Sequence, residues 1–149
     1  IIHIWLAVKP ATMENGCLRV LPRSHLDSIL RLIPSNDEAN MLLEGSNAEP
    51  DASDAQFVNV VLDAGEASLH HHRMVHGSGP NQSSDDRLGL SLTYMTPSTR
   101  NARRQDSAML VRGNDKIGNF EFETPPDIDF SSKAVAAFQR AIFSPGGGE

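Results

Sequence analysis

The chain has 149 residues, and this length predicts a single domain over residues 1–149. With 13 Lys and Arg against 19 Asp and Glu, the net charge of −6 argues against a nucleic-acid partner, which would require a basic surface. No apolar run approaches the roughly 18 residues of a membrane span, and the single cysteine, Cys17, has no internal disulfide partner, so we expect a protein of the reducing cytoplasm.

The first predicted element is a strand over residues 1–8. Its even-numbered positions from Ile2 onward are apolar, whereas His3 and Trp5 lie on the opposite face. Because the chain opens within this strand, at Ile1, we expect it to be a fragment of a longer protein. An unpaired strand edge at Ile1 would also favour pairing with a second copy of the chain, so a homo-oligomer is expected as one option.

A turn and a second short strand follow. Asn15-Gly16 is a strong turn signal, and residues 17–21 have the composition of a strand. These two features predict a hairpin between residues 1–8 and 17–21.

The next part of the chain is expected to be a short helix and a loop. Ser24 is a candidate cap for a helix whose apolar positions fall between Leu26 and Ile33, and Pro34 would stop it. Residues 35–55 are polar and rich in turn formers, which predicts a surface loop. Alternation over residues 56–62 then predicts another strand.

Two more strands frame a histidine-rich segment, and a helix is expected near the end of the chain. Residues 64–69 run into the histidines, a turn with glycine and proline follows, and residues 87–94 form the returning strand. Apolar positions at helical spacing follow Asp129. Many short strands with few short helices predict a mainly β fold, a jelly-roll or cupin-like barrel whose mouth can hold a metal and a small ligand.

The histidine cluster has three interpretations: an exposed run, hydrogen-bonded histidines of a polar barrel interior, or a source of a metal ligand. Alternation places His70, His72 and His76 on one face and His71 on the other. Since only His76 stands at a strand end beside a turn of small residues, we choose His76 as the candidate metal ligand.

Arg87 is the second candidate site residue. At the start of the returning strand it would lie beside the histidine turn and could hold a carboxylate through two parallel hydrogen bonds. The alternative is an ordinary surface arginine that pairs with Asp85 or Asp86.

Five segments together resemble the phytanoyl-CoA dioxygenase family: residues 5–8, 14–25 (Glu-Asn-Gly through Pro-Arg-Ser-His), 76–81 (His-Gly-Ser-Gly-Pro-Asn), Arg87 and 88–94. The later run 106–113 resembles a bacterial branch of that family. The resemblance implies a double-stranded β-helix, incomplete here at its N-terminus. It also implies an Fe(II)- and 2-oxoglutarate-dependent dioxygenase that uses dioxygen to hydroxylate an unactivated C–H bond of a small organic substrate.

The resemblance implies a role for individual residues. His76 matches the distal histidine that binds the iron, and Arg87 matches the arginine that binds the far carboxylate of 2-oxoglutarate. Ser78 matches a serine that helps to hold that carboxylate, and Trp5 matches a tryptophan that lines the co-substrate pocket. The family usually has glycine where this chain has Arg23, a departure that we expect to affect a surface loop.

The His-x-Asp pair that supplies the other two metal ligands in the family would fall before Ile1. His25-Leu26-Asp27 has the right letters, but it aligns with a segment that carries no metal ligand in the family. These residues alone are therefore expected to bind iron weakly and to show little turnover. Two alternatives stay open: a halogenase of the family, if the pair lacks its carboxylate, or a cupin-like binding module without redox chemistry.

Overall fold

The computed structural model describes residues 1–27, 30–34, 46–48, 56–101 and 106–143. The chain divides into two compact units, Ile1–Tyr94 and Met95–Glu149. Each unit is described by itself below, and a single domain over residues 1–149 stays a prediction.

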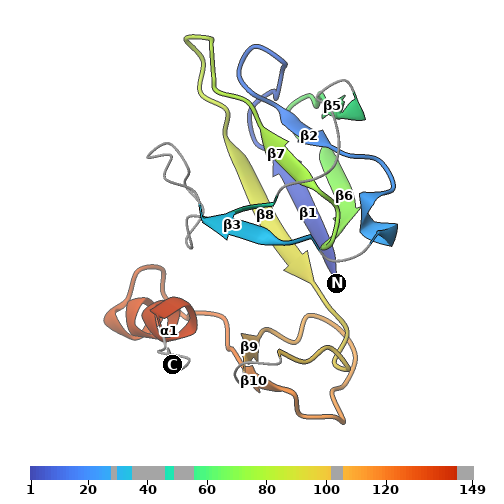
Figure 1. The fold of residues 1–149 in the computed structure, drawn as a ribbon. Coiled ribbons are helices and arrows are strands. Elements are labelled where there is room, and N and C mark those ends of the chain that lie inside the picture. The colour runs from blue at the N-terminus through green and yellow to red at the C-terminus, as the bar shows by residue number, and fades with distance from the viewer. Residues whose placement is uncertain (28–29, 35–45, 49–55, 102–105, 144–149) are drawn as a thin grey trace. The chain divides into compact units, whose positions relative to one another are not determined.

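The first sheet of unit 1 carries the predicted first strand at its centre. β1 (Ile2–Ala7) pairs antiparallel with β6 (Ala67–His71) on one side and with β8 (Gly89–Tyr94) on the other (Figure 1). Since side chains alternate along a strand, one face of β1 is aliphatic and the other carries His3 and Trp5, as predicted.

The second sheet of unit 1 places β2 (Leu18–Val20) between β5 (Val58–Val60) and β7 (His76–Ser78), again antiparallel. The chain passes from β5 in this sheet to β6 in the first, back to β7 and again to β8 (Figure 1). This alternation between two antiparallel sheets is the jelly-roll arrangement. The predicted mainly β, jelly-roll fold is confirmed.

Two predictions about the first strand were wrong. β1 and β2 do not form a hairpin, because each pairs with later strands in a different sheet. The segment between them crosses from one sheet to the other, so the Asn-Gly signal marked a turn within a crossover. Ile2–Ala7 also has partners on both sides, so β1 is not an open edge. Its edge therefore gives no reason for pairing with a second copy, and a homo-oligomer stays a prediction.

The Glu-Asn-Gly turn supports the loop that follows β7. The Asn15 side chain accepts from the Thr12 amide at 2.8 Å and donates to the Pro10 carbonyl at 2.9 Å, which closes the turn. Gly16 has φ +77°, and a Cβ built on it would lie 2.6 Å from the Gly79 carbonyl oxygen. The turn thus needs glycine for its conformation and for its close contact with the loop.

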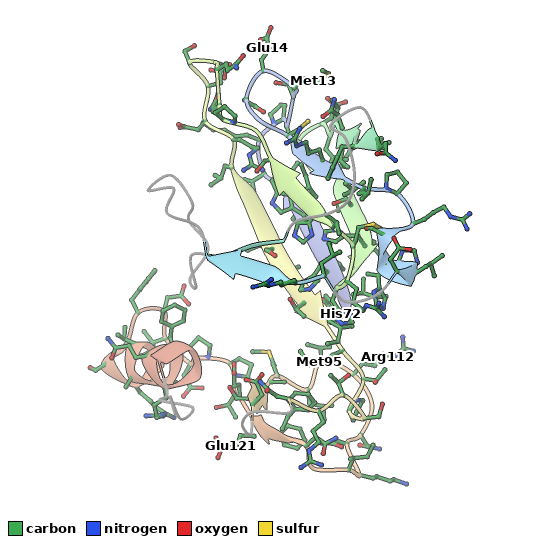
Figure 2. The ribbon with its side chains drawn as sticks, in the orientation of Figure 1. Met13, Glu14, His72, Met95, Arg112 and Glu121 are labelled. Atoms are coloured by element: carbon green, nitrogen blue, oxygen red, sulfur yellow. The ribbon has the colours of Figure 1, made fainter. Side chains whose placement is uncertain are left out.

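Met13 and Glu14 lie at the outer end of the same turn (Figure 2). The side chain of Met13 is exposed. The Glu14 carbonyl accepts a hydrogen bond from the Gln82 amide at 2.8 Å, which is a second link between the turn and the loop after β7.

The predicted short helix is mostly a different structure. Of the described residues in this segment, only Ser24–Leu26 is helical, as one 3-10 turn, and Leu32–Pro34 is a strand, β3, paired with β4 (Ser46–Ala48). Most of the predicted loop 35–55 lies outside the described residues. Arg23 precedes the 3-10 turn with φ +70°, in the left-handed region that favours glycine, which gives a physical reason for the glycine that the resemblance implies at this position.

The described part of unit 2 contains two short parallel strands and a helix. β9 (Asp106–Ala108) pairs with β10 (Phe120–Phe122). The predicted terminal helix is α1 (Ser132–Phe143). Over the part of the chain that the structure describes, no helix combines the length and apolar character that crossing a membrane requires.

Candidate functional site between the two sheets

Three predicted site residues meet at the start of β8. The guanidinium of Arg87 lies over the Trp5 ring, 5.5 Å from its centroid, and its Nη2 donates to Ser78 Oγ at 3.4 Å. Trp5 comes from β1 and Ser78 from the end of β7. Sequence segments more than 70 residues apart are therefore joined around one guanidinium group.

Gly89 lets Trp5 occupy this place. A Cβ built on Gly89 would lie 2.2 Å from Cζ2 of the Trp5 ring. The indole therefore rests directly on the backbone of β8, two residues from Arg87. Glycine at this position keeps the ring against the strand that carries the arginine.

The alternative interpretation of Arg87, an ion pair with Asp85 or Asp86, does not match the structure. Asp86 pairs instead with Lys9, at 3.4 Å between two exposed side chains. Within the described residues no carboxylate lies within ion-pair distance of Arg87. A partly buried guanidinium that contacts only a hydroxyl and an aromatic ring has donors left for a bidentate anion.

His76 begins β7, opposite Val20 of β2. Its Nδ1 lies 2.7 Å from the Met74 carbonyl oxygen. Since a carbonyl only accepts, Nδ1 carries the proton and Nε2 keeps its lone pair. This is the tautomer and the backbone bond by which metal-binding histidines are commonly oriented.

Ser24 holds the peptide that precedes His76. Its buried Oγ accepts from the Val75 amide at 2.8 Å and contacts the sulfur of Met74 at 3.4 Å. Ser24 was predicted to cap a helix, but it makes no capping bond: the residue at the N-cap is Arg23. Ser24 instead ties the 3-10 turn after β2 to Val75 and Met74, and the Met74 carbonyl fixes the His76 ring.

We expect Ser24→Ala to lower the free energy of unfolding by about 1–3 kcal/mol, because it leaves the Val75 amide without a partner. Urea denaturation measures this loss. Ser98→Ala is the matched control, since it removes an exposed hydroxyl that bonds Thr96 and should change stability by less than about 0.5 kcal/mol. Equal losses in the two variants would show that the bond to Val75 contributes nothing.

Two further histidines lie beside His76. The His70 ring is 5.1 Å from that of His76 and 5.8 Å from that of His3, and Thr93 Oγ1 lies 3.0 Å from His3 Nδ1. Burial, and then the neighbouring His76, lower the pKa of both His3 and His70. Neutral imidazoles are thereby favoured.

The predicted alternation of side chains along residues 70–76 is partly wrong. β6 ends at His71 and β7 begins at His76, with a turn between them, so residues 70–76 are not one strand. His70 and His76 still meet because they belong to different sheets whose side chains face each other.

His25 and Asp27 do not join His76. The His25 ring contacts that of His71, at 5.5 Å, and the Arg73 guanidinium donates to the Asp27 carbonyl. The described residues contain no group of three or more His, Cys, Asp or Glu side chains that could hold a metal ion.

Several residues of this site were not predicted. His3 and His70 could have been found, since alternation puts His3 on the face of Trp5 and a register of β1 with β6 puts His70 opposite His3. The role of Ser24 could not have been found, because nothing in the sequence distinguishes a serine that caps a helix from one that bonds a distant backbone amide.

Comparison with known proteins shows related sequences and structures. The model of the family described as "Phytanoyl-CoA dioxygenase (PhyH)" matches residues 1–89. Phytanoyl-CoA dioxygenase domain-containing protein 1 of Danio rerio is 34% identical over 88 residues, which are 58% of this chain and 30% of that protein. Dioxygenase lolE1 of Epichloe uncinata is 31% identical over 93 residues, 62% of this chain and 32% of that protein.

Among solved structures, the apo form of the non-heme monooxygenase ThoJ is 35% identical with a TM-score of 0.80, and the match covers 95% of this chain and 50% of that one. EvdO2 from Micromonospora carbonacea var. aurantiaca, in complex with 2-oxoglutarate, is 29% identical with a TM-score of 0.52, covering 60% of this chain and 36% of that one. The chain thus spans about a third of the length of the relatives that it matches in sequence and half of ThoJ.

Proposed function

Because the chain belongs to the phytanoyl-CoA dioxygenase family, we propose that it forms part of an Fe(II)- and 2-oxoglutarate-dependent dioxygenase that hydroxylates an unactivated C–H bond of a small organic substrate. The observation that carries this proposal is the group of Arg87, Ser78 and Trp5 beside His76. The similarity of the chain to a non-heme monooxygenase and to a structure that holds 2-oxoglutarate supports the same function.

Arg87 and Ser78 are proposed to hold the far carboxylate of 2-oxoglutarate. The guanidinium offers paired donors and a permanent positive charge, and the hydroxyl adds a further donor. Trp5 covers one face of the guanidinium and shields that face from water. Charge-assisted hydrogen bonds in such a partly dry place are stronger than those between neutral groups.

His76 is proposed as the iron ligand of this chain. Its Nδ1–H is engaged by the Met74 carbonyl, so the Nε2 lone pair is free to bind a metal. Bound Fe(II), with 2-oxoglutarate, supplies the activation of dioxygen for attack on a C–H bond. The residues of the chain orient the ligand and the co-substrate, and the His-x-Asp pair implied by the resemblance stays a prediction.

Anaerobic titration with Fe(II) and then 2-oxoglutarate tests the proposal, in the protein carrying its native upstream sequence. We expect the weak visible charge-transfer band of chelated 2-oxoglutarate in the wild type and no band in His76→Ala. His71→Ala is the matched control, since its side chain lies on the other face of β6 from His70 and should keep the band. A wild-type protein that shows no band is not an oxygenase of this kind, and a binding module would then explain the fold.

A further inference from the structure

The face of the first sheet that carries Trp5 is polar over two neighbouring rows of side chains. Trp5 pairs with a serine on each side, and His3 pairs with a histidine and a threonine. Directly paired residues share a face, so no aliphatic side chain enters these two rows. We call the five polar residues the polar wall: His3, Ser68, His70, Ser91 and Thr93.

Two buried atoms of the polar wall have no hydrogen-bond partner among the described residues. They are Ser68 Oγ and His70 Nδ1, which lie two residues apart on the same face of β6. A buried polar atom without a partner costs about 1–3 kcal/mol, and such atoms in a folded protein call for an explanation. Two of them side by side on one wall indicate a place where a polar ligand binds.

The polar wall extends the proposed site in one direction. Arg87 covers Trp5, and Ser68 pairs with Trp5 in the register of β1 and β6. The next row of that register holds His3 and His70, and the His70 ring contacts His76. The polar wall therefore begins beside Arg87 and Trp5 and continues to the ring of His76, the proposed iron ligand.

We propose that the polar wall binds the primary substrate, with His70 Nδ1 and Ser68 Oγ as its hydrogen-bonding atoms, and that this substrate carries a hydroxyl, carbonyl or amide group near the carbon that reacts. The inference rests on the proposed function and adds a substrate class to it. An aliphatic acyl chain in this place would leave both buried atoms without partners. Sites built to hydrogen-bond a substrate strongly reject analogues that lack the bonding group.

The first test is the stability of His70→Leu without substrate. Leucine has a similar size and removes a polar atom that has no partner, so we expect the melting temperature to rise by about 2 °C or more. His71→Leu is the matched control on the opposite face of β6, where Nδ1 accepts from the Arg73 amide at 3.2 Å, and its melting temperature should fall. A fall in His70→Leu would overturn the proposal, because His70 would then have a structural partner.

The second test measures succinate release by the full-length protein with Fe(II), 2-oxoglutarate and two probe sets, N-acetyl amino acid amides and linear alkanes such as n-octane, which carry no polar group. We expect release above the substrate-free rate only with amides, and a KM for the active amide about 10-fold higher in His70→Leu and in Ser68→Ala. Stimulation by n-octane overturns the inference, because an alkane offers no partner to His70 Nδ1 or Ser68 Oγ. If no probe stimulates succinate release, the melting temperature of His70→Leu decides whether the inference stands.

Two outcomes distinguish a failure of this inference from a failure of the proposed function. If His70→Leu weakens 2-oxoglutarate binding as much as a change at Arg87, the wall belongs to the co-substrate site and the inference is wrong. If the wild type shows no charge-transfer band with Fe(II) and 2-oxoglutarate, the proposed function fails, whatever the stability of the variant shows.

Discussion

Replacing Arg87 by Ala should weaken the binding of 2-oxoglutarate about 100-fold. A bidentate bond between guanidinium and carboxylate is worth about 1.5–3 kcal/mol, and each 1.4 kcal/mol is tenfold in affinity. Calorimetric titration of the metal-loaded protein measures the loss. Arg87→Lys should recover part of the affinity, since lysine keeps the charge and loses the paired geometry.

Arg19→Ala is the matched control for that experiment. Arg19 also lies over an aromatic ring, that of Phe57, at 5.3 Å. It pairs with Gly77 of β7, between the positions of His76 and Ser78, and so points to the other face of that sheet. Its removal should leave the affinity for 2-oxoglutarate unchanged. A loss of similar size in both variants would mean that net charge, and not the Arg87 pocket, sets the affinity.

Part of this site could be predicted from the sequence because it depends on local patterns. Period-two alternation placed His3 and Trp5 on one face of the first strand, and the structure confirms that strand as β1. A histidine before a turn of small residues and an arginine at the start of the next strand were sufficient to select His76 and Arg87. The structure brings Arg87 together with Ser78 and Trp5, while the roles of these residues stay proposals.

The errors come from contacts between distant parts of the chain. An Asn-Gly signal indicates a turn but not which strands pair across it, so the expected hairpin was wrong: β1 and β2 lie in different sheets. A serine near a short helix looks the same in sequence whether it caps that helix or bonds a backbone amide 51 residues away, as Ser24 does. The polar wall likewise follows from the register of three strands that no local signal specifies.

The Glu-Asn-Gly turn was expected to be structural, and the contact of Gly16 with Gly79 supplies a physical reason. Gly79 directly follows Ser78, so the turn supports the loop between the serine and Arg87. The hydrogen bond from the Gln82 amide to the Glu14 carbonyl holds the same loop three residues later. A substitution in the turn should therefore shift Ser78 and Arg87 although the turn contacts neither side chain.

Gly16→Ala should lower the free energy of unfolding by about 2–5 kcal/mol. Alanine in the left-handed region costs about 1–2 kcal/mol, and forcing a methyl group against a backbone oxygen costs about 1–3 kcal/mol more. Gly65 is the matched control, because it has φ +90° but no atom within 4 Å of an added Cβ. Gly65→Ala should therefore show only the conformational cost.

The difference between these two variants isolates the contact with Gly79. Urea denaturation gives the two free energies, and titration with 2-oxoglutarate gives the effect on the site. We expect Gly16→Ala to weaken co-substrate binding and Gly65→Ala to leave it unchanged, since Gly65 lies in the turn before β6, away from the loop that holds Ser78. Equal losses of stability in both variants would show that an added methyl group at Gly16 does not press on the Gly79 carbonyl oxygen. An unchanged affinity in Gly16→Ala would show that Ser78 and Arg87 keep their places without the turn.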